Sequence, residues 1–213
     1  MSIDWNEAQQ EQAYSEFADS LAAELYDEHK ERAIEELVSE RLSSYYLHHP
    51  HIAGQAIAFL KKAKSYKDCD PVASLLYSCS ATEVLLKTVL VKPIVYGLVH
   101  TESLAELIAS KVVGEPTIDR LKQLIFGILE HHIAFENGIE KFCRDGSELP
   151  IWDERGKIQK VRNCILHQAK PCKSEDAELS LKVLMAFLGL TDSLLRNIGL
   201  KLSKGGLIVY ENK

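Results

Sequence analysis

The stretch VRNCILHQ, residues 161–168, places an arginine, an asparagine and a histidine within two turns of a predicted helix. At about 100° per residue, Arg162, Asn163 and His167 fall within an arc of roughly 140°, so we expect them to face one region of space. Histidine titrates near neutral pH and can act as an acid or a base, whereas arginine stays charged and grips phosphate oxygens. The three residue types together favour cleavage of a phosphodiester.

RNA is the phosphodiester that suits such a site best, because it carries its own nucleophile, the 2′-hydroxyl beside each phosphate. Cleavage needs a base for that hydroxyl, an acid for the leaving 5′-oxygen and positive charge on the phosphate. We therefore predict no metal and no cofactor. The alternative is structural: Arg162 would pair with acidic neighbours, and His167 would be favoured by the dipole at the C-terminal end of its helix.

Glu83 is a second residue with an expected role, because it projects into an apolar face of a predicted helix. That face consists of Val72, Leu76, Cys79, Leu86 and Leu90. A carboxylate among apolar side chains is costly unless it is paired. We predict Arg162 as its partner, so that Glu83 supports the motif by holding the guanidinium. The alternatives are a shifted helix phase or a pair with Lys87, one turn further on.

Charge is distributed unevenly along the chain. Residues 1–47 hold twelve acidic and three basic residues, whereas residues 48–213 carry a formal charge of +3 within a total of −6. Residues 151–173 contain six bases and two acids. The total charge argues against a protein that covers nucleic acid without regard to sequence, but the local excess of basic residues suits the binding of a polyanion. We predict that three of these bases bind RNA: Arg155, Lys160 and Lys170.

The elements that must position these residues are predicted to be helices throughout. Residues 1–47 are expected to form an acidic helical arm, residues 48–202 a helical bundle, and residues 203–213 a short tail that could add a small strand. Within the bundle, Asp70 should cap a helix that runs to about Val91 and stops before Pro93. Further helices are predicted at five places: from the end of the break HHPHIAG (residues 48–54) to about Tyr66, 102–113, 117–143, 153 to about 170 and 174–202. The fold class is all-α.

Composition fits a soluble globular protein of the cytoplasm. Hydrophobic residues make up 46% and charged residues 26% of the 213 residues, and the five cysteines are scattered and never spaced as CxxC. The N-terminus is too polar for a signal peptide, and no unbroken apolar run approaches the roughly 20 residues of a membrane span. The histidines at positions 48, 49 and 51 are interpreted as a loop at a helix junction rather than a metal site. We expect the acidic arm to pack as extra helices or to form a dimer interface. The alternative is that the arm covers the basic patch.

The motif RNCILH resembles the RNxxxH motif of HEPN domains, small helical bundles found in many prokaryotic toxins, phage-defence proteins and RNA-processing enzymes. IQKVRNCILHQ is similar to the motif helix of that family, and LLYSCSATEVLLKTVL is similar to its earlier helix; the resemblance covers about residues 50–202. It implies a metal-independent endoribonuclease acting as a homodimer, with one composite site where two motif helices meet.

By this resemblance Arg162 binds the scissile phosphate, His167 shuttles the proton, and Asn163 orients the other two or holds the helix. In some HEPN toxins a tyrosine two residues after the histidine is modified by an antitoxin, but Ala169 stands there in this chain, so that partnership is not expected. A different regulatory protein partner is left open. Other members of the family are not catalytic and bind a protein or a nucleotide, which is the alternative function.

Overall fold

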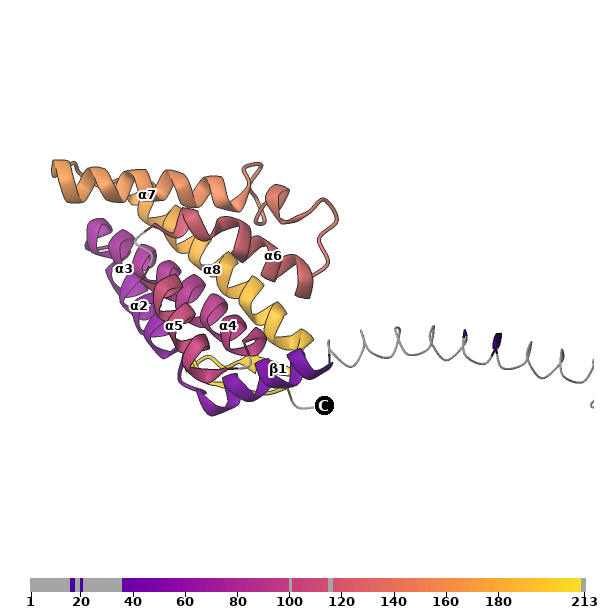
Figure 1. The fold of residues 1–213 in the computed structure, drawn as a ribbon. Coiled ribbons are helices and arrows are strands. Elements are labelled where there is room, and N and C mark those ends of the chain that lie inside the picture. Colours follow the sequence, from indigo (N-terminus) through magenta and orange to yellow (C-terminus); the bar gives the residue numbers. More distant parts are fainter. Residues whose placement is uncertain (1–15, 18–19, 21–35, 100, 115–116, 212–213) are drawn as a thin grey trace, which may run out of the picture. The chain divides into compact units, whose positions relative to one another are not determined.

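The computed structural model describes residues 16–17, 20, 36–99, 101–114 and 117–211. The chain divides into two compact units, Met1–Glu40 and Arg41–Lys213, and the second is mostly helical, as predicted (Figure 1). Most of the predicted acidic arm lies outside the described residues. The second unit opens with helical residues 41–48, and its later elements follow in chain order: α2 (Gly54–Tyr66), α3 (Pro71–Val84), η1 (Leu85–Val91), α4 (Lys92–Leu98), α5 (Glu102–Val113), η2 (Ile118–Leu121), α6 (Lys122–His132), η3 (Ile139–Lys141), α7 (Ile151–Gln168), α8 (Ser174–Asn197), β1 (Leu200–Leu202) and β2 (Ile208–Tyr210).

The boundary between the two units lies before the one we predicted at residue 47. Leu42 and Tyr46 belong to the core of the second unit, where both side chains are fully buried. Residues 41–48 therefore form the first helical segment of the bundle rather than the end of a separate arm. Because acidic residues dominate the sequence up to Glu40, the sequence does not reveal that residues 41–48 pack in the core.

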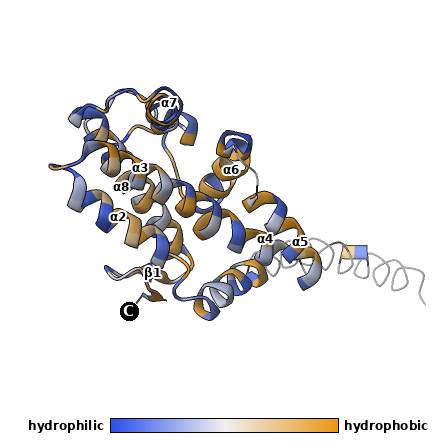
Figure 2. Ribbon diagram, turned by 90° about the vertical axis from the view of Figure 1, so that its left-hand side faces the viewer, coloured by the Kyte–Doolittle hydropathy of each residue, from blue (hydrophilic) through white to orange (hydrophobic). Residues whose placement is uncertain are grey.

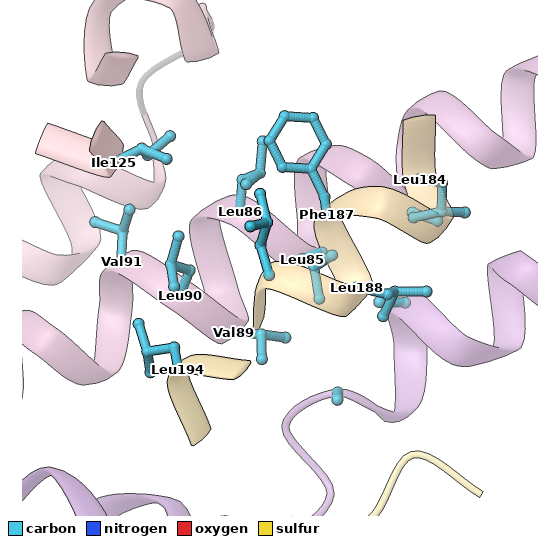
Figure 3. Close-up of a cluster of buried hydrophobic side chains, with 14 of the residues drawn as sticks. Leu85, Leu86, Val89, Leu90, Val91, Ile125, Leu184, Phe187, Leu188 and Leu194 are labelled. Atoms are coloured by element: carbon cyan, nitrogen blue, oxygen red, sulfur yellow. The ribbon is translucent and has the colours of Figure 1, made fainter. Parts of the chain in front are cut away.

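The core is built around α3 and its continuation η1, which pack against α2 on one side and α8 on the other. Figure 3 shows Leu86 and Phe187 side by side, with further leucines and valines of η1 and α8 around them. Burial of this apolar surface is the main favourable contribution to folding. Figure 2 shows hydrophobic and hydrophilic segments alternating along the helices, as expected where each helix buries one side.

Asp70 caps α3 as predicted, because its side chain accepts a hydrogen bond from the backbone N–H of Ala73 at 3.0 Å. The predicted stop before Pro93 is wrong: the chain stays helical through η1 and α4 to Leu98. A proline inside a helix removes one N–H donor and crowds the carbonyl four residues earlier. Here η1 is a π-helix, and the Lys92 N–H bonds to Lys87 O, five residues back, which displaces the carbonyls ahead of Pro93.

The carbonyl of Val89, four residues before Pro93, is satisfied from outside the helix. Tyr46 donates its hydroxyl to Val89 O at 2.7 Å, and Tyr46 is fully buried. Burial raises the pKa of Tyr46, so the hydroxyl remains protonated and continues to donate. This long-range bond explains how the helix passes a proline without an unpaired buried carbonyl.

Replacing Tyr46 with phenylalanine is therefore expected to lower the free energy of unfolding by about 2 kcal/mol, because Val89 O would be buried without a donor. Chemical denaturation of the full chain measures this change. Tyr77→Phe is the matched control, since Tyr77 contributes ring contacts with Phe59 and Tyr66 that phenylalanine keeps. Equal stability of the two variants would contradict the assigned role of the Tyr46 hydroxyl.

The joined helical run Pro71–Gly97 is long and apolar enough to cross a membrane by length and composition, and 61% of its most apolar window is buried inside the bundle. The sequence predicts no membrane span here, because no unbroken apolar run approaches roughly 20 residues. Its position between α2 and α8 is that of a central core helix.

The helix predicted for residues 117–143 is shorter in the structure. After the 3-10 turn η2, α6 ends at His132, and Gly138 then adopts a positive φ of 76°. Glu130 accepts a hydrogen bond from the Ile139 N–H at 2.9 Å and so fixes the reversal of the chain. Glycine is the residue that adopts such a φ without strain.

The C-terminal helix also ends earlier than predicted, at Asn197 rather than near residue 202. Gly199, with a φ of 75°, turns the chain into β1, which pairs antiparallel with β2 as the tail prediction allowed. The hairpin rests on the start of the bundle, because Ile208 N–H donates to Pro50 O at 2.9 Å. It covers the core without contributing to the motif helix.

Candidate functional site

Helix α7 carries the motif, and its N-terminal half is fixed in the bundle. It begins at Ile151, two residues before the Asp153 start that we predicted, with Pro150 as its N-cap. Ile151 and Trp152 are buried core residues, and Trp152 makes edge contacts with Phe126 and Phe187. The first turn of α7 is therefore held by apolar packing against α6 and α8.

Two consecutive charged residues in the second turn, Glu154 and Arg155, are also buried, with 4% and 5% of their surfaces exposed. Arg144 donates two hydrogen bonds to the Glu154 carboxylate, both at 2.9 Å, and Ser147 donates a third at 2.7 Å. These bonds join the loop 144–150 to α7. A buried carboxylate needs such compensation, because the cost of removing it from water is large.

Arg155 does not occupy the RNA-facing position that we predicted for it. It forms an ion pair with Asp119 of η2 at 2.7 Å, and its guanidinium lies 4.7 Å from the centre of the Trp152 ring. Burial lowers the pKa of Arg155, while the Asp119 and Glu83 carboxylates oppose this shift and keep the side chain charged. The Asp119 carboxylate also accepts from Trp152 Nε1 at 3.1 Å. Arg155 thus anchors α7 in the bundle and does not lie on the exposed surface of the helix.

The motif residues lie on the C-terminal half of α7, which extends past α3 at one end of the bundle (Figure 1). Asn163 and His167 are exposed, and Arg162 is half-buried. Within the described part of the chain, neither Arg162 nor His167 makes an ion pair or a side-chain hydrogen bond. Both groups are therefore available to a ligand, in contrast to the paired charges at the other end of the helix.

The structure does not join Arg162 to His167 by a direct contact. The Arg162 charge acts on Cys79 of α3, and lowers the pKa of that thiol against the stronger effect of burial, which raises it to about 12. Arg162 thus lies on the flank of α7 that turns toward α3. His167 lies about 140° further around the helix axis, on the exposed flank. The two groups therefore lie at the two edges of the arc that we predicted, without a direct contact between them in the described chain.

Glu83 is half-buried on α3 and faces α7, but its surroundings differ from the pair that we predicted. No ion pair joins Glu83 to Arg162 among the described residues. Instead Glu83 lines a small cavity together with Arg155 and Gln159. The buried cation in this lining is Arg155, which precedes Arg162 by seven residues, about two helical turns, on the same flank of α7.

Lys160 and Lys170 are exposed, as the predicted RNA contacts require. Lys160 lies on α7 just before the motif, and Lys170 follows the end of the helix. With Arg162, they give this end of the bundle an excess of positive charge that is open to solvent. Such an arrangement attracts a polyanion at low salt.

Cysteine chemistry and metal binding receive no support from the described residues. Cys164, which lies between motif residues, is half-buried and free, and the high pKa of Cys79 keeps that thiol protonated. No group of three or more histidine, cysteine, aspartate or glutamate side chains in the described ranges could hold a metal ion. The histidines at 48, 49 and 51 lie at a helix end and the turn after it, in agreement with the loop interpretation.

Helix α7 ends at Gln168 through an unusual residue. Ala169 adopts a left-handed conformation, with a φ of 50°, and its N–H donates to Ile165 O at 3.1 Å. The Lys170 N–H donates to Cys164 O, which completes a C-terminal cap. The motif helix thus ends at Gln168, one residue after His167. Ala169 then stands at a position where glycine would adopt the same conformation with less strain.

Ala169→Gly is expected to raise the free energy of unfolding by about 0.5 kcal/mol, because the strain of a left-handed alanine exceeds the entropy that glycine gains in the unfolded chain. Thermal and chemical denaturation measure this small increase. Ala58→Gly, at an exposed position inside α2, is the matched control and should destabilise by about 0.5–1 kcal/mol. A loss of stability in both variants would show that Ala169 is not strained.

Comparison of the chain with family models, with curated proteins and with solved structures found no match. The resemblance to HEPN domains therefore rests on the motif, its place on the penultimate helix and the helical fold.

Proposed function

We propose that this protein is a metal-independent endoribonuclease of the HEPN type that acts in the cytoplasm. Arg162 binds the scissile phosphate, His167 transfers protons to and from the reacting oxygens, and Asn163 orients them. The 2′-hydroxyl attacks the neighbouring phosphorus, the 5′-oxygen leaves, and the products carry a 2′,3′-cyclic phosphate and a 5′-hydroxyl. A role in a toxin or phage-defence system follows from the resemblance alone.

One observation carries the proposal: the motif residues lie on a protruding helix end whose cation and imidazole form no ion pair or side-chain hydrogen bond within the described chain. A buried structural arginine in the same helix, Arg155, has an ion pair and a stacked ring, so pairing is available to charges in this fold. Charged groups left unpaired beside exposed lysines are what a phosphate-binding site requires.

The proposal includes a homodimer, because the resemblance implies a composite site and the described chain shows no contact between its own Arg162 and His167. The groups lie about 140° apart around the helix. A second copy of α7, packed antiparallel against the first, would place the His167 of one chain near the Arg162 of the other. An exposed apolar side chain within the motif arc supports such packing, since Leu166 lies between Arg162 and His167 around the helix and is 50% exposed.

Incubation of the purified full chain with end-labelled RNA in EDTA tests the reaction. The expected result is cleavage that leaves cyclic phosphates, identified by their resistance to phosphatase until acid opens the ring. A deoxy substitution at the cleaved nucleotide should block the reaction, because it removes the nucleophile. Intact RNA, or products with 3′-hydroxyl ends, would refute the proposed chemistry.

The second candidate is a non-catalytic module that binds a protein or a nucleotide through the same helix end. The wide angle between Arg162 and His167 favours it if the chain is a monomer. Sedimentation at working concentration separates the two functions: a monomer that binds RNA without cutting it supports the module, and a dimer that cuts supports the enzyme.

A further inference from the structure

A small cavity of about 10 Å³ lies between α3, α7 and α8, beneath the motif. Its volume is close to the space that a single water molecule needs. Its lining exposes more apolar than polar surface, but it includes the charged side chains of Glu83 and Arg155 and the amide of Gln159. A water molecule in such a space needs about two to four polar partners, which these side chains can supply.

The hydroxyls in the lining already donate elsewhere. Thr82 donates to Ser78 O at 2.9 Å, and Ser180 donates to Ala177 O at 2.8 Å. Arg155 uses one nitrogen on Asp119, at 2.7 Å, and a guanidinium has four further N–H groups. The strongest hydrogen-bonding groups left in the lining are the Glu83 carboxylate, the remaining Arg155 N–H donors and the Gln159 carbonyl oxygen, because the Cys79 thiol is a weak donor and the two hydroxyl oxygens can only accept.

Glu83 and Arg155 line the same cavity but do not form an ion pair with each other within the described structure. Each nevertheless acts on the other electrostatically, since Glu83 is among the groups that raise the pKa of Arg155 against its burial. Two opposite charges that face one water-sized space without touching are commonly bridged by a water molecule.

Gln159 connects this cavity to the motif. Its side-chain Nε2 donates to Asn163 Oδ1 at 3.3 Å, one turn further along α7. The same residue lines the cavity. Gln159 is thus the residue through which a change in the cavity would reach a motif side chain, because no other lining residue in the described structure forms a side-chain hydrogen bond with the motif.

We propose that the cavity binds one water molecule, which accepts a hydrogen bond from Arg155 and donates to Glu83 and to the Gln159 carbonyl oxygen. Gln159 then presents its amino group to Asn163. In this arrangement Gln159 is a positioning residue: it acts through Asn163 and does not touch RNA. The positioning role rests on the proposed endoribonuclease function, whereas the water site does not.

NMR of the full chain tests the water site without any substrate. Cross-peaks from a long-lived water to the side-chain amide of Gln159 are expected, and none from such a water to Gln123, an exposed glutamine of α6. Thr82→Val and Ser180→Ala remove the nearby hydroxyls, and the cross-peaks should persist in both variants. Their absence in the wild type, or their loss with the hydroxyls, overturns the water site.

Gln159→Leu tests the positioning role, because it keeps the side-chain volume and removes both polar ends. The expected result is a kcat lower by about tenfold with KM unchanged, since Arg162 still binds the phosphate while Asn163 loses its fixed orientation. The side-chain amide resonance of Asn163 should shift in the same variant. Gln123→Leu is the matched control and should change neither quantity.

The outcomes separate the two proposals. If the wild type leaves RNA intact, the endoribonuclease is refuted, and the NMR cross-peaks still decide the water site. If the wild type cleaves RNA and Gln159→Leu keeps full kcat and an unshifted Asn163 resonance, the positioning role is wrong. Should Gln159→Leu unfold, Gln159→Glu replaces it: its carboxylate requires the Asn163 amide to turn, so a shifted resonance with a reduced kcat supports positioning, and an unshifted one rejects it.

Discussion

His167→Ala is expected to reduce the rate of RNA cleavage by about 10²–10⁴-fold, because it removes the proposed proton-transfer group, which is the one histidine of α7. Arg162→Ala is expected to reduce it by about 10²–10³-fold through the loss of positive charge on the phosphate in the transition state. Neither variant should lose stability, since His167 is exposed and Arg162 is only half-buried. Single-turnover cleavage in EDTA and thermal denaturation measure the two effects side by side.

Matched controls separate chemistry from general charge. Lys157→Ala removes an exposed cation from the same helix, and His51→Ala removes an exposed histidine from another part of the bundle. Both should cleave RNA at nearly the wild-type rate. Mixing His167→Ala with Arg162→Ala adds a test of the composite site, because a mixed dimer contains one intact Arg162–His167 combination and should recover part of the activity. A dimer without recovery would mean that each chain carries a complete site.

The sequence predicted the helical class and several boundaries because local signals decide them. Asp70 before Pro71 identified the start of α3. The motif residues were placed on α7 correctly, because apolar periodicity fixes the helix and the helix fixes the spacing. The exposure of Asn163 and His167 follows from the same pattern.

What the sequence missed depends on contacts between distant residues. Passage of the helix through Pro93 requires the hydroxyl of Tyr46, more than forty residues away. Arg155 and Arg162 stand seven residues apart and therefore share one flank of α7, so periodicity could not say which of them is buried. Asp119 decides it, by meeting Arg155 from a 3-10 turn that no local signal identified.

The dependence on contacts between distant residues also explains why the predicted partner of Glu83 was wrong. We predicted Arg162 as its partner on the basis of motif and phase, and the structure places Glu83 at a cavity shared with Arg155. A carboxylate on an apolar face does require compensation, so the physical argument was sound. The identity of the compensating group depends on how far along α7 the two helices cross, which a sequence does not encode locally.

The anchoring of α7 has its own large expected effect. Glu154→Ala should lower the free energy of unfolding by about 3 kcal/mol, because it leaves the bidentate Arg144 guanidinium without its buried partner and detaches the loop 144–150. Chemical denaturation measures the loss. Glu178→Ala is the control: it breaks an exposed pair with Lys182 on α8 and should change stability far less.

A double-mutant cycle identifies the part of this loss that belongs to the pair. Arg144→Ala alone leaves the Glu154 carboxylate buried with only Ser147 as a donor, so it should destabilise strongly as well. The double variant should then be less destabilised than the sum of the two single variants, because the second replacement removes a charge that the first had left unpaired. Additive losses would mean that the two side chains stabilise the protein independently of each other, which contradicts the assigned pair.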